Sequence, residues 1–127
     1  SKLDNYQFCH LVYSYDQPTS NLFQHIIPLL NSIDLATVTK IKVNMNPRTS
    51  KIVEHGFHTD VPFKCKPGIL YLNSNDGYTS FEDGTKVESV ENRFVTFDSN
   101  IKHSGTTCTN QKVRLVLNIN YFQFDQS

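Results

Sequence analysis

The sequence has 127 residues, and its 12 basic and 12 acidic side chains give a formal net charge of zero. This length fits one domain, spanning residues 1–127, whose core is large enough to fold without disulfide or metal staples. The charge balance gives no support for a general nucleic-acid binder, and no apolar run approaches the ~20 residues of a membrane span, so neither partner is expected.

The three cysteines, Cys9, Cys65 and Cys108, are odd in number, and no two have the spacing of a zinc knuckle. Free thiols in a reducing compartment are the favoured interpretation, and no signal peptide is visible, so a cytoplasmic protein is expected. Nine Phe and six Tyr residues, together with many Val, Ile and Thr residues, favour a sheet-rich fold.

The first part of the chain combines an extended segment with a helix. Residues 6–15 are predicted to be extended, up to a turn that contains a proline. Thr19 or Ser20 can cap a helix whose apolar residues recur at gaps of three and four as far as Ile33. Pro28 interrupts this stripe, which predicts a kink or two short pieces.

From Val38 onward the apolar period changes to two. Ile41, Val43 and Met45 alternate with polar residues, which predicts a strand with one apolar and one polar face. Further short strands are predicted at Val53–Val61, Gly68–Asn73, Tyr78–Phe81, Lys86–Val90, Arg93–Asp98 and Val113–Phe124.

Turn signals separate these strands. The sequence Asn-Asp-Gly at 75–77 predicts a hairpin, and Asp83-Gly84 predicts a second turn. Many short strands that follow one early helix favour a sandwich or barrel, so the fold class is mainly β with a few helices.

The stretch His55–Asp60 carries the first chemical signal. His58 and Asp60 are two residues apart, so they point the same way if the segment is extended. His55 is three residues from His58, and an extended chain would point it away from the pair. Two ligands on one face form a metal site only if a third arrives from elsewhere.

His103 is the best candidate for the third ligand, because it stands alone just before a predicted strand. His25 lies in the predicted helix, and His10 lies before the barrel begins. Two histidines and one carboxylate leave three positions open on an octahedral metal, as in iron(II) oxygenases, although zinc can take the same ligands.

Arg114 distinguishes between these two metals. It lies on the polar face of the last predicted strand, where a guanidinium needs an anion because an unpaired buried charge is costly. A dicarboxylate could supply that anion and bind bidentately.

Taken together, His58-Thr59-Asp60, His103 and Arg114 resemble the motif of the 2-oxoglutarate- and iron(II)-dependent dioxygenases. The resemblance covers roughly residues 38–124. The stretches 41–44 and 54–60 look most like the small prolyl-hydroxylase-like branch, which includes oxygenases of marine bacteriophages. It implies a double-stranded β-helix, a jelly-roll or cupin-like barrel, over about 38–124, preceded by the strand and helix of 6–33.

The resemblance also implies roles for single residues. The iron ligands would be His58, Asp60 and His103, while Arg114 and Tyr71, from a Tyr-Leu-Asn strand, would hold the far carboxylate of 2-oxoglutarate. The first and last barrel strands would be neighbours. Their polar faces would then line the pocket, with Asn44, Asn46 and Asn118 as candidate lining residues.

The implied activity is hydroxylation of an unactivated C–H bond, coupled to decarboxylation of 2-oxoglutarate to succinate. The implied cofactors are iron(II), 2-oxoglutarate and O2, with ascorbate as a further candidate. The primary substrate is left open between a prolyl or other protein residue and a small molecule. The contrasting hypothesis is a non-catalytic or zinc-binding cupin-like module that binds a ligand, which would have no use for Arg114.

Overall fold

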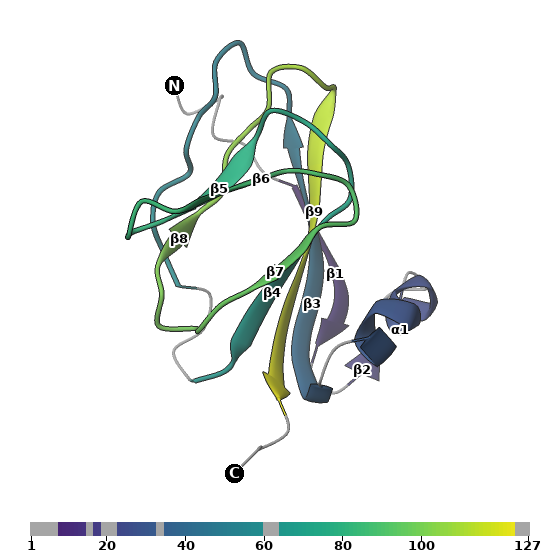
Figure 1. The fold of residues 1–127 in the computed structure, drawn as a ribbon. Helices are drawn as coiled ribbons and strands as arrows, with labels where there is room; N and C mark the ends of the chain where they lie inside the picture. Colours follow the sequence, from purple (N-terminus) through teal and green to yellow (C-terminus); the bar gives the residue numbers. More distant parts are fainter. Residues whose placement is uncertain (1–7, 15–16, 19–22, 33–34, 60–63, 124–127) are drawn as a thin grey trace.

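The computed structural model describes residues 8–14, 17–18, 23–32, 35–59 and 64–123. Within these ranges the chain forms two antiparallel sheets that face each other, and one helix covers the outer face of the larger sheet (Figure 1). This arrangement confirms the predicted mainly β, jelly-roll class. None of the helices described is long and apolar enough to cross a membrane.

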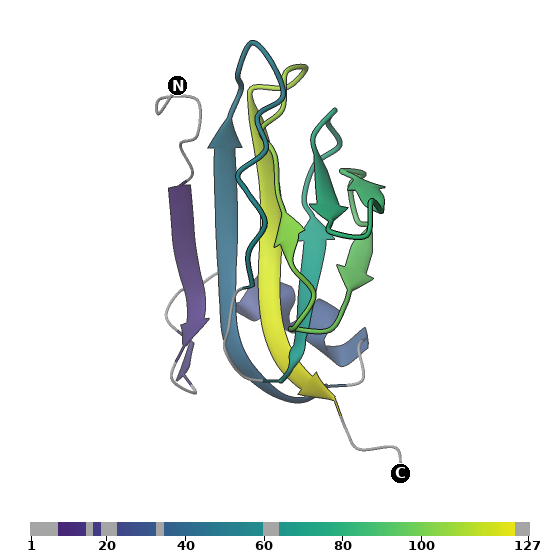
Figure 2. The same cartoon turned by 90° about the vertical axis from the view of Figure 1, so that its left-hand side faces the viewer.

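The larger sheet has six strands in the order β2-β1-β3-β9-β4-β7 (Figure 2). Their bounds are β1 Phe8–Ser14, β2 Gln17–Pro18, β3 Leu35–Pro47, β4 Lys66–Tyr71, β7 Phe94–Thr96 and β9 Val113–Gln123. The smaller sheet has the order β6-β5-β8, with β5 Tyr78–Phe81, β6 Lys86–Glu88 and β8 His103–Ser104.

The centre of the larger sheet is the long antiparallel pair β3 and β9. Val43 lies opposite Leu117, and Lys42 lies opposite Asn118. Because side chains alternate across a strand, this register gives both strands one apolar face and one polar face on the same two sides. The apolar face turns toward the helix, and the polar face turns toward the smaller sheet.

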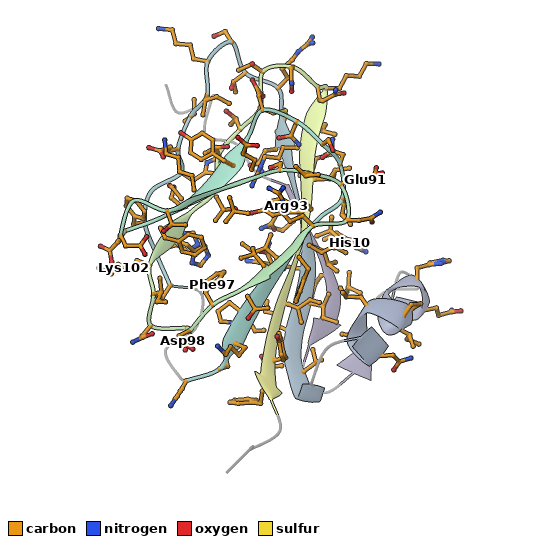
Figure 3. All side chains as sticks on the ribbon, viewed as in Figure 1. His10, Glu91, Arg93, Phe97, Asp98 and Lys102 are labelled. Carbon is orange, nitrogen blue, oxygen red and sulfur yellow. The ribbon has the colours of Figure 1, made fainter. Side chains whose placement is uncertain are left out.

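The core has two parts that lie on opposite sides of the larger sheet. The part beneath the helix consists of Val12, Val38, Ile41, Leu117, Ile119 and Tyr121, with Leu29 and Leu30 of the helix packed against it. The part between the sheets consists of Ile69, Tyr71, Phe81, Phe97 and Val116. Figure 3 shows Phe97 between β4 and the smaller sheet, whereas Lys102 lies at the periphery.

Most predicted elements are confirmed, and the helix differs in one respect. α1, Phe23–Ser32, runs unbroken through Pro28, so the prediction of two pieces is wrong. A proline at this position removes the hydrogen bond to residue 24 and crowds that carbonyl, and apolar packing against the sheet stabilises the helix despite this. The proposed capping residues, Thr19 and Ser20, lie outside the described residues.

Two other predictions are wrong. Residues 53–59 form isolated bridges rather than a ladder, because Gly56 has φ +106° and breaks the extended geometry. The Asn-Asp-Gly sequence at 75–77 does not close a hairpin: β4 and β5 belong to different sheets, and the Asn75 side chain accepts a hydrogen bond from Gly77 N in a turn that joins them. Asp83-Gly84 does close the hairpin of β5 and β6.

The packing beneath α1 yields a stability prediction. Ile119 is 0% exposed, so Ile119→Ala should lower the free energy of unfolding by about 2–5 kcal/mol. Urea denaturation measures this value, with exposed Ile101→Ala as the control, whose expected change is about 0.5 kcal/mol. Equal losses in the two variants would show that this face is not a core.

Candidate functional site

A cavity of about 80 Å³ lies between the two sheets, on the polar face of β3 and β9. Its walls combine cationic, imidazole, amide and hydroxyl groups with two aliphatic side chains. The lining residues are Lys42, Asn44, His55, His58, Ile69, Thr79, His103, Gly105, Arg114, Val116 and Asn118. None of these lining residues is acidic, so the cavity suits an anionic ligand.

His58 and His103 meet at one side of the cavity. Each backbone N–H donates to the other residue's carbonyl at 3.0 Å, and the ring centroids are 4.6 Å apart. His103 is buried, and the Phe97 ring lies 4.8 Å from it, centroid to centroid. Residues 45 positions apart in the sequence are therefore adjacent in space, as a shared metal site requires.

The protonation of His58 also fits a metal ligand. Its Nδ1 lies 3.0 Å from the carbonyl oxygen of Gly56, which can accept only from a protonated nitrogen. The proton on Nδ1 leaves Nε2 with the lone pair that a metal needs. A backbone hydrogen bond thus sets the tautomer and the ring orientation of this histidine.

Asp60, the third expected ligand, lies outside the described residues. Within the ranges that the structure does describe, no three His, Cys, Asp or Glu side chains are arranged to hold a metal ion. The two histidines therefore fit part of a metal site, and completion of that site depends on Asp60.

His55 lines the same cavity, contrary to the expectation that it points away from His58. That expectation assumed an extended chain, and the positive φ of Gly56 turns the backbone between the two histidines. Burial lowers the pKa of His55, and the positive charge of Arg114 lowers it further. A glycine between the two histidines is the signal in the sequence that could have corrected the expectation.

Arg114 is 2% exposed and reaches the cavity from β9. Its Nε donates to Ser89 Oγ at 3.0 Å, its Nη1 to the Thr106 carbonyl at 3.2 Å and its Nη2 to Thr79 Oγ1 at 3.4 Å. All of these acceptors are neutral, and no carboxylate of the described residues pairs with the guanidinium. Burial lowers the pKa of Arg114, so its charged form would gain from an anion.

Tyr71 was expected to contact a ligand, but the residue that lines the cavity here is Thr79. Tyr71 is 0% exposed, and its hydroxyl donates to Thr79 Oγ1 at 2.7 Å. Burial raises the pKa of Tyr71, so this hydroxyl keeps its proton and remains a donor. Tyr71 therefore does not line the cavity itself but contacts Thr79, which does.

Thr79 is left with a hydrogen to donate. Its oxygen accepts from both Tyr71 and Arg114, which fills the two acceptor positions of a hydroxyl. The remaining O–H belongs to a side chain that is 1% exposed and lines the cavity. Sequence reasoning missed Thr79, because a threonine on a strand is ordinary and only the three-dimensional contacts distinguish it.

The predicted pocket asparagines divide into two groups. Asn44 and Asn118 line the cavity, whereas Asn46 lies opposite Arg114 on the same face, is fully buried and does not line it. Lys42 also lines the cavity and was missed, although its place on the polar face of β3 follows from the alternation that was recognised.

The remaining histidines lie away from this site. His10 is on β1 opposite Val43, and Figure 3 shows it on the helix side of the larger sheet. His25 is on α1 and lines an apolar groove against β9 rather than the cavity.

No protein-family model matches the sequence, and a search of the curated proteins finds no match. Similar solved structures include a prolyl hydroxylase from Trichoplax adhaerens (TM-score 0.67, 15% identity, covering 92% of this chain and 63% of that one) and a Pseudomonas putida prolyl-4-hydroxylase (0.62, 16%, 92% and 69%). The DMSP lyase DddQ from Ruegeria pomeroyi DSS-3 is also similar (0.59, 12%, 95% and 49%).

Cupin proteins are among the other similar structures. The chain spans about half the length of the lyase and about two thirds of the length of the two hydroxylases. At these identities the likeness concerns the fold alone. The chain has a cupin-type fold that is also found in prolyl hydroxylases.

Proposed function

We propose that this chain is an iron(II)- and 2-oxoglutarate-dependent oxygenase that hydroxylates an unactivated C–H bond. The observation that carries the proposal is Arg114, a buried cation on a cavity wall whose described partners are all neutral. The pair of His58 and His103 on the same cavity supports it.

The buried guanidinium argues for an anionic ligand. Removing a cation from water costs several kcal/mol unless a counter-charge or hydrogen bonds compensate. The neutral oxygens around Arg114 give hydrogen bonds but no opposite charge, and three of its five N–H groups are used in this way. A carboxylate in the cavity would take the other two and supply the charge.

Thr79 would be the third donor to that carboxylate. Because Tyr71 and Arg114 already occupy its acceptor positions, its O–H can be satisfied by an acceptor in the cavity. Tyr71 then acts as a positioning residue that fixes the Thr79 hydroxyl, and the far carboxylate of 2-oxoglutarate would receive donors from both Arg114 and Thr79.

Iron(II) would be held by His58, His103 and Asp60. That metal would supply the activation of O2, and the overall reaction converts a substrate C–H, O2 and 2-oxoglutarate into C–OH, succinate and CO2. The residues of this chain bind and orient the two organic molecules, and the facing sheets exclude water around Arg114.

The comparisons favour an oxygenase without fixing its substrate. Two similar structures are prolyl hydroxylases, and one of these was determined with a peptide fragment of hypoxia inducible factor. The alternative is a non-catalytic or zinc-binding cupin-like module, and a lyase is among the other similar structures. A module or lyase whose ligand is neutral would give no reason for a cation buried at Arg114.

Cosubstrate binding provides the first test of the proposal. Addition of 2-oxoglutarate to the iron(II) protein without oxygen should give a weak visible charge-transfer band. Arg114→Ala should weaken 2-oxoglutarate binding by about 2–5 kcal/mol, which is roughly 30-fold or more. Titration of the band measures this affinity, and Arg114→Lys gives a second, milder substitution in case the alanine variant does not fold.

The matched control is exposed Arg48→Ala, which should bind 2-oxoglutarate as the wild type does. If the wild type gives no band, and no succinate once air is admitted, the oxygenase proposal is wrong. If the wild type and the Arg114 variants bound 2-oxoglutarate with equal affinity, Arg114 would not be a 2-oxoglutarate-binding residue.

Metal binding is a separate prediction. His58→Ala should lower iron(II) affinity by more than the about 10–100-fold that changes around the ligands cause. Equilibrium dialysis under argon, followed by metal analysis, measures the affinity, and His25→Ala is the control on exposed helix surface. Unchanged iron binding by His58→Ala would exclude it as a ligand.

Gly77 supports the position of Arg114. A Cβ at this glycine would lie 2.6 Å from Arg114 Cδ and 2.7 Å from the Thr107 carbonyl oxygen, both closer than real contacts. The backbone of Thr107 cannot move as easily as a side chain, so an added methyl group would displace the arginine or strain the loop.

Gly77→Ala should therefore lower the free energy of unfolding by about 1–3 kcal/mol and also weaken 2-oxoglutarate binding. Gly105→Ala is the control for stability, because the nearest atom to its added Cβ is 3.5 Å away, an ordinary contact. Denaturation measures the stability of both variants, and titration measures their 2-oxoglutarate affinity. If Gly77→Ala had the stability and the affinity of the wild type, the prediction would be wrong.

A further inference from the structure

The cavity contains a second cation that an anion at Arg114 does not neutralise. Lys42 lines the cavity from β3, and no ion pair or side-chain hydrogen bond joins it to another described residue. The acidic side chains of the described residues are all absent from the lining. Among the described residues, the cavity lining therefore offers Lys42 no counter-charge.

The two cations are anchored far apart along the same pair of strands. Lys42 lies opposite Asn118, and Arg114 is four residues earlier on β9. Four residues of an extended strand span about 13 Å. The guanidinium is also held in place by Ser89 and the Thr106 carbonyl, so its position does not depend on Lys42.

Asn44 adds donors beside Lys42. Its Oδ1 accepts a hydrogen bond from Cys9 Sγ at 3.0 Å, which directs the amide oxygen toward β1. The NH2 group of this side chain, which is 7% exposed and lines the cavity, has no hydrogen-bond partner among the described residues. This NH2 group is therefore available to donate to an acceptor in the cavity.

The Lys42 ammonium and the Asn44 NH2 group, two residues apart on one face of β3, offer only hydrogen-bond donors. The ligand that satisfies them has an acceptor with negative charge, and a carboxylate meets both needs. A neutral prolyl residue within a polypeptide offers at most its backbone carbonyl and would leave the Lys42 charge uncompensated.

We infer that the primary substrate is a small carboxylic acid, whose carboxylate is held by Lys42 and Asn44 while the carbon to be hydroxylated lies toward His58 and His103. This inference rests on the proposed oxygenase function and narrows its substrate. On this inference the substrate is a small charged molecule rather than a neutral residue of a large protein.

The test uses a panel of free amino acids and short carboxylic acids, each paired with its primary amide, which lacks the charge and has an NH2 donor in place of one acceptor oxygen. The iron(II) protein with 2-oxoglutarate and O2 is screened by mass spectrometry for the gain of one oxygen. At least one acid should be oxidised, with kcat/KM tenfold or more above that of its amide. Ligand-observed NMR of the same pairs measures binding without turnover.

Three variants assign the effect. Lys42→Met keeps the aliphatic stem and should lose tenfold or more in affinity for the acid, Lys42→Arg should retain most of it, and Lys40→Met is the control at an exposed position of the same strand. Lys40→Met should bind 2-oxoglutarate as the wild type does, and Lys42→Met should weaken this binding far less than Arg114→Ala does, which separates this site from Arg114.

Two results would overturn the inference: amides that bind or react as well as their acids, or Lys42→Met that behaves as Lys40→Met does. If 2-oxoglutarate fails to bind, the proposed function fails. The acid–amide comparison by NMR then still decides whether Lys42 holds a carboxylate.

Discussion

The register between β3 and β9 is the constraint on which the site depends. With Val43 opposite Leu117 and Asn46 opposite Arg114, the face of the pair that turns toward α1 is apolar, and the face that turns toward the smaller sheet is polar except for Val116. A slip of one residue would exchange the two faces, bury Lys42 and Arg114 beneath the helix and leave leucines in the cavity. The hydrophobic core under α1 thus determines the chemistry on the other side of the sheet.

This arrangement carries an energetic cost, because several of the polar groups between the two sheets, Arg114, Asn44 and Thr79 among them, are buried. Hydrogen bonds to neutral partners offset part of this cost, such as those that Arg114 donates to Ser89 and to the Thr106 carbonyl. Several hydrogen-bond donors have no acceptor among the described residues: two N–H groups of Arg114, the Thr79 hydroxyl, the Asn44 NH2 group and the Lys42 ammonium. A cavity that presents an excess of donors and has no acid in its described lining is preorganised for anions.

Much of the fold could be predicted from the sequence, because alternation and turn chemistry are local. The period of two at residues 41–45 predicted β3, and Asp83-Gly84 predicted a hairpin that the structure contains. The same local reasoning failed at Gly56, whose positive φ redirects His55 into the cavity. It also failed at 75–77, where a side chain caps a turn between sheets rather than a hairpin.

The grouping of His58, His103 and Arg114 was predicted from ligand chemistry together with the resemblance, since no local pattern relates residues this far apart. Thr79 and Lys42 were missed for a different reason: their importance depends on which partners their atoms already have. Thr79 lies between Tyr71 and the cavity because of the hydrogen bonds that its side chain accepts from Tyr71 and Arg114. Neither the spacing nor the composition of the sequence predicts these bonds.

The central claim is that the counter-charge of Arg114 comes from a ligand. The most direct measurement is a crystal structure of the iron(II) protein soaked with 2-oxoglutarate under argon. The account predicts one carboxylate within hydrogen-bond distance, about 3 Å, of both the Arg114 guanidinium and the Thr79 hydroxyl. A carboxylate bound elsewhere, or an Arg114 that pairs with an acidic side chain of the protein itself, would contradict it.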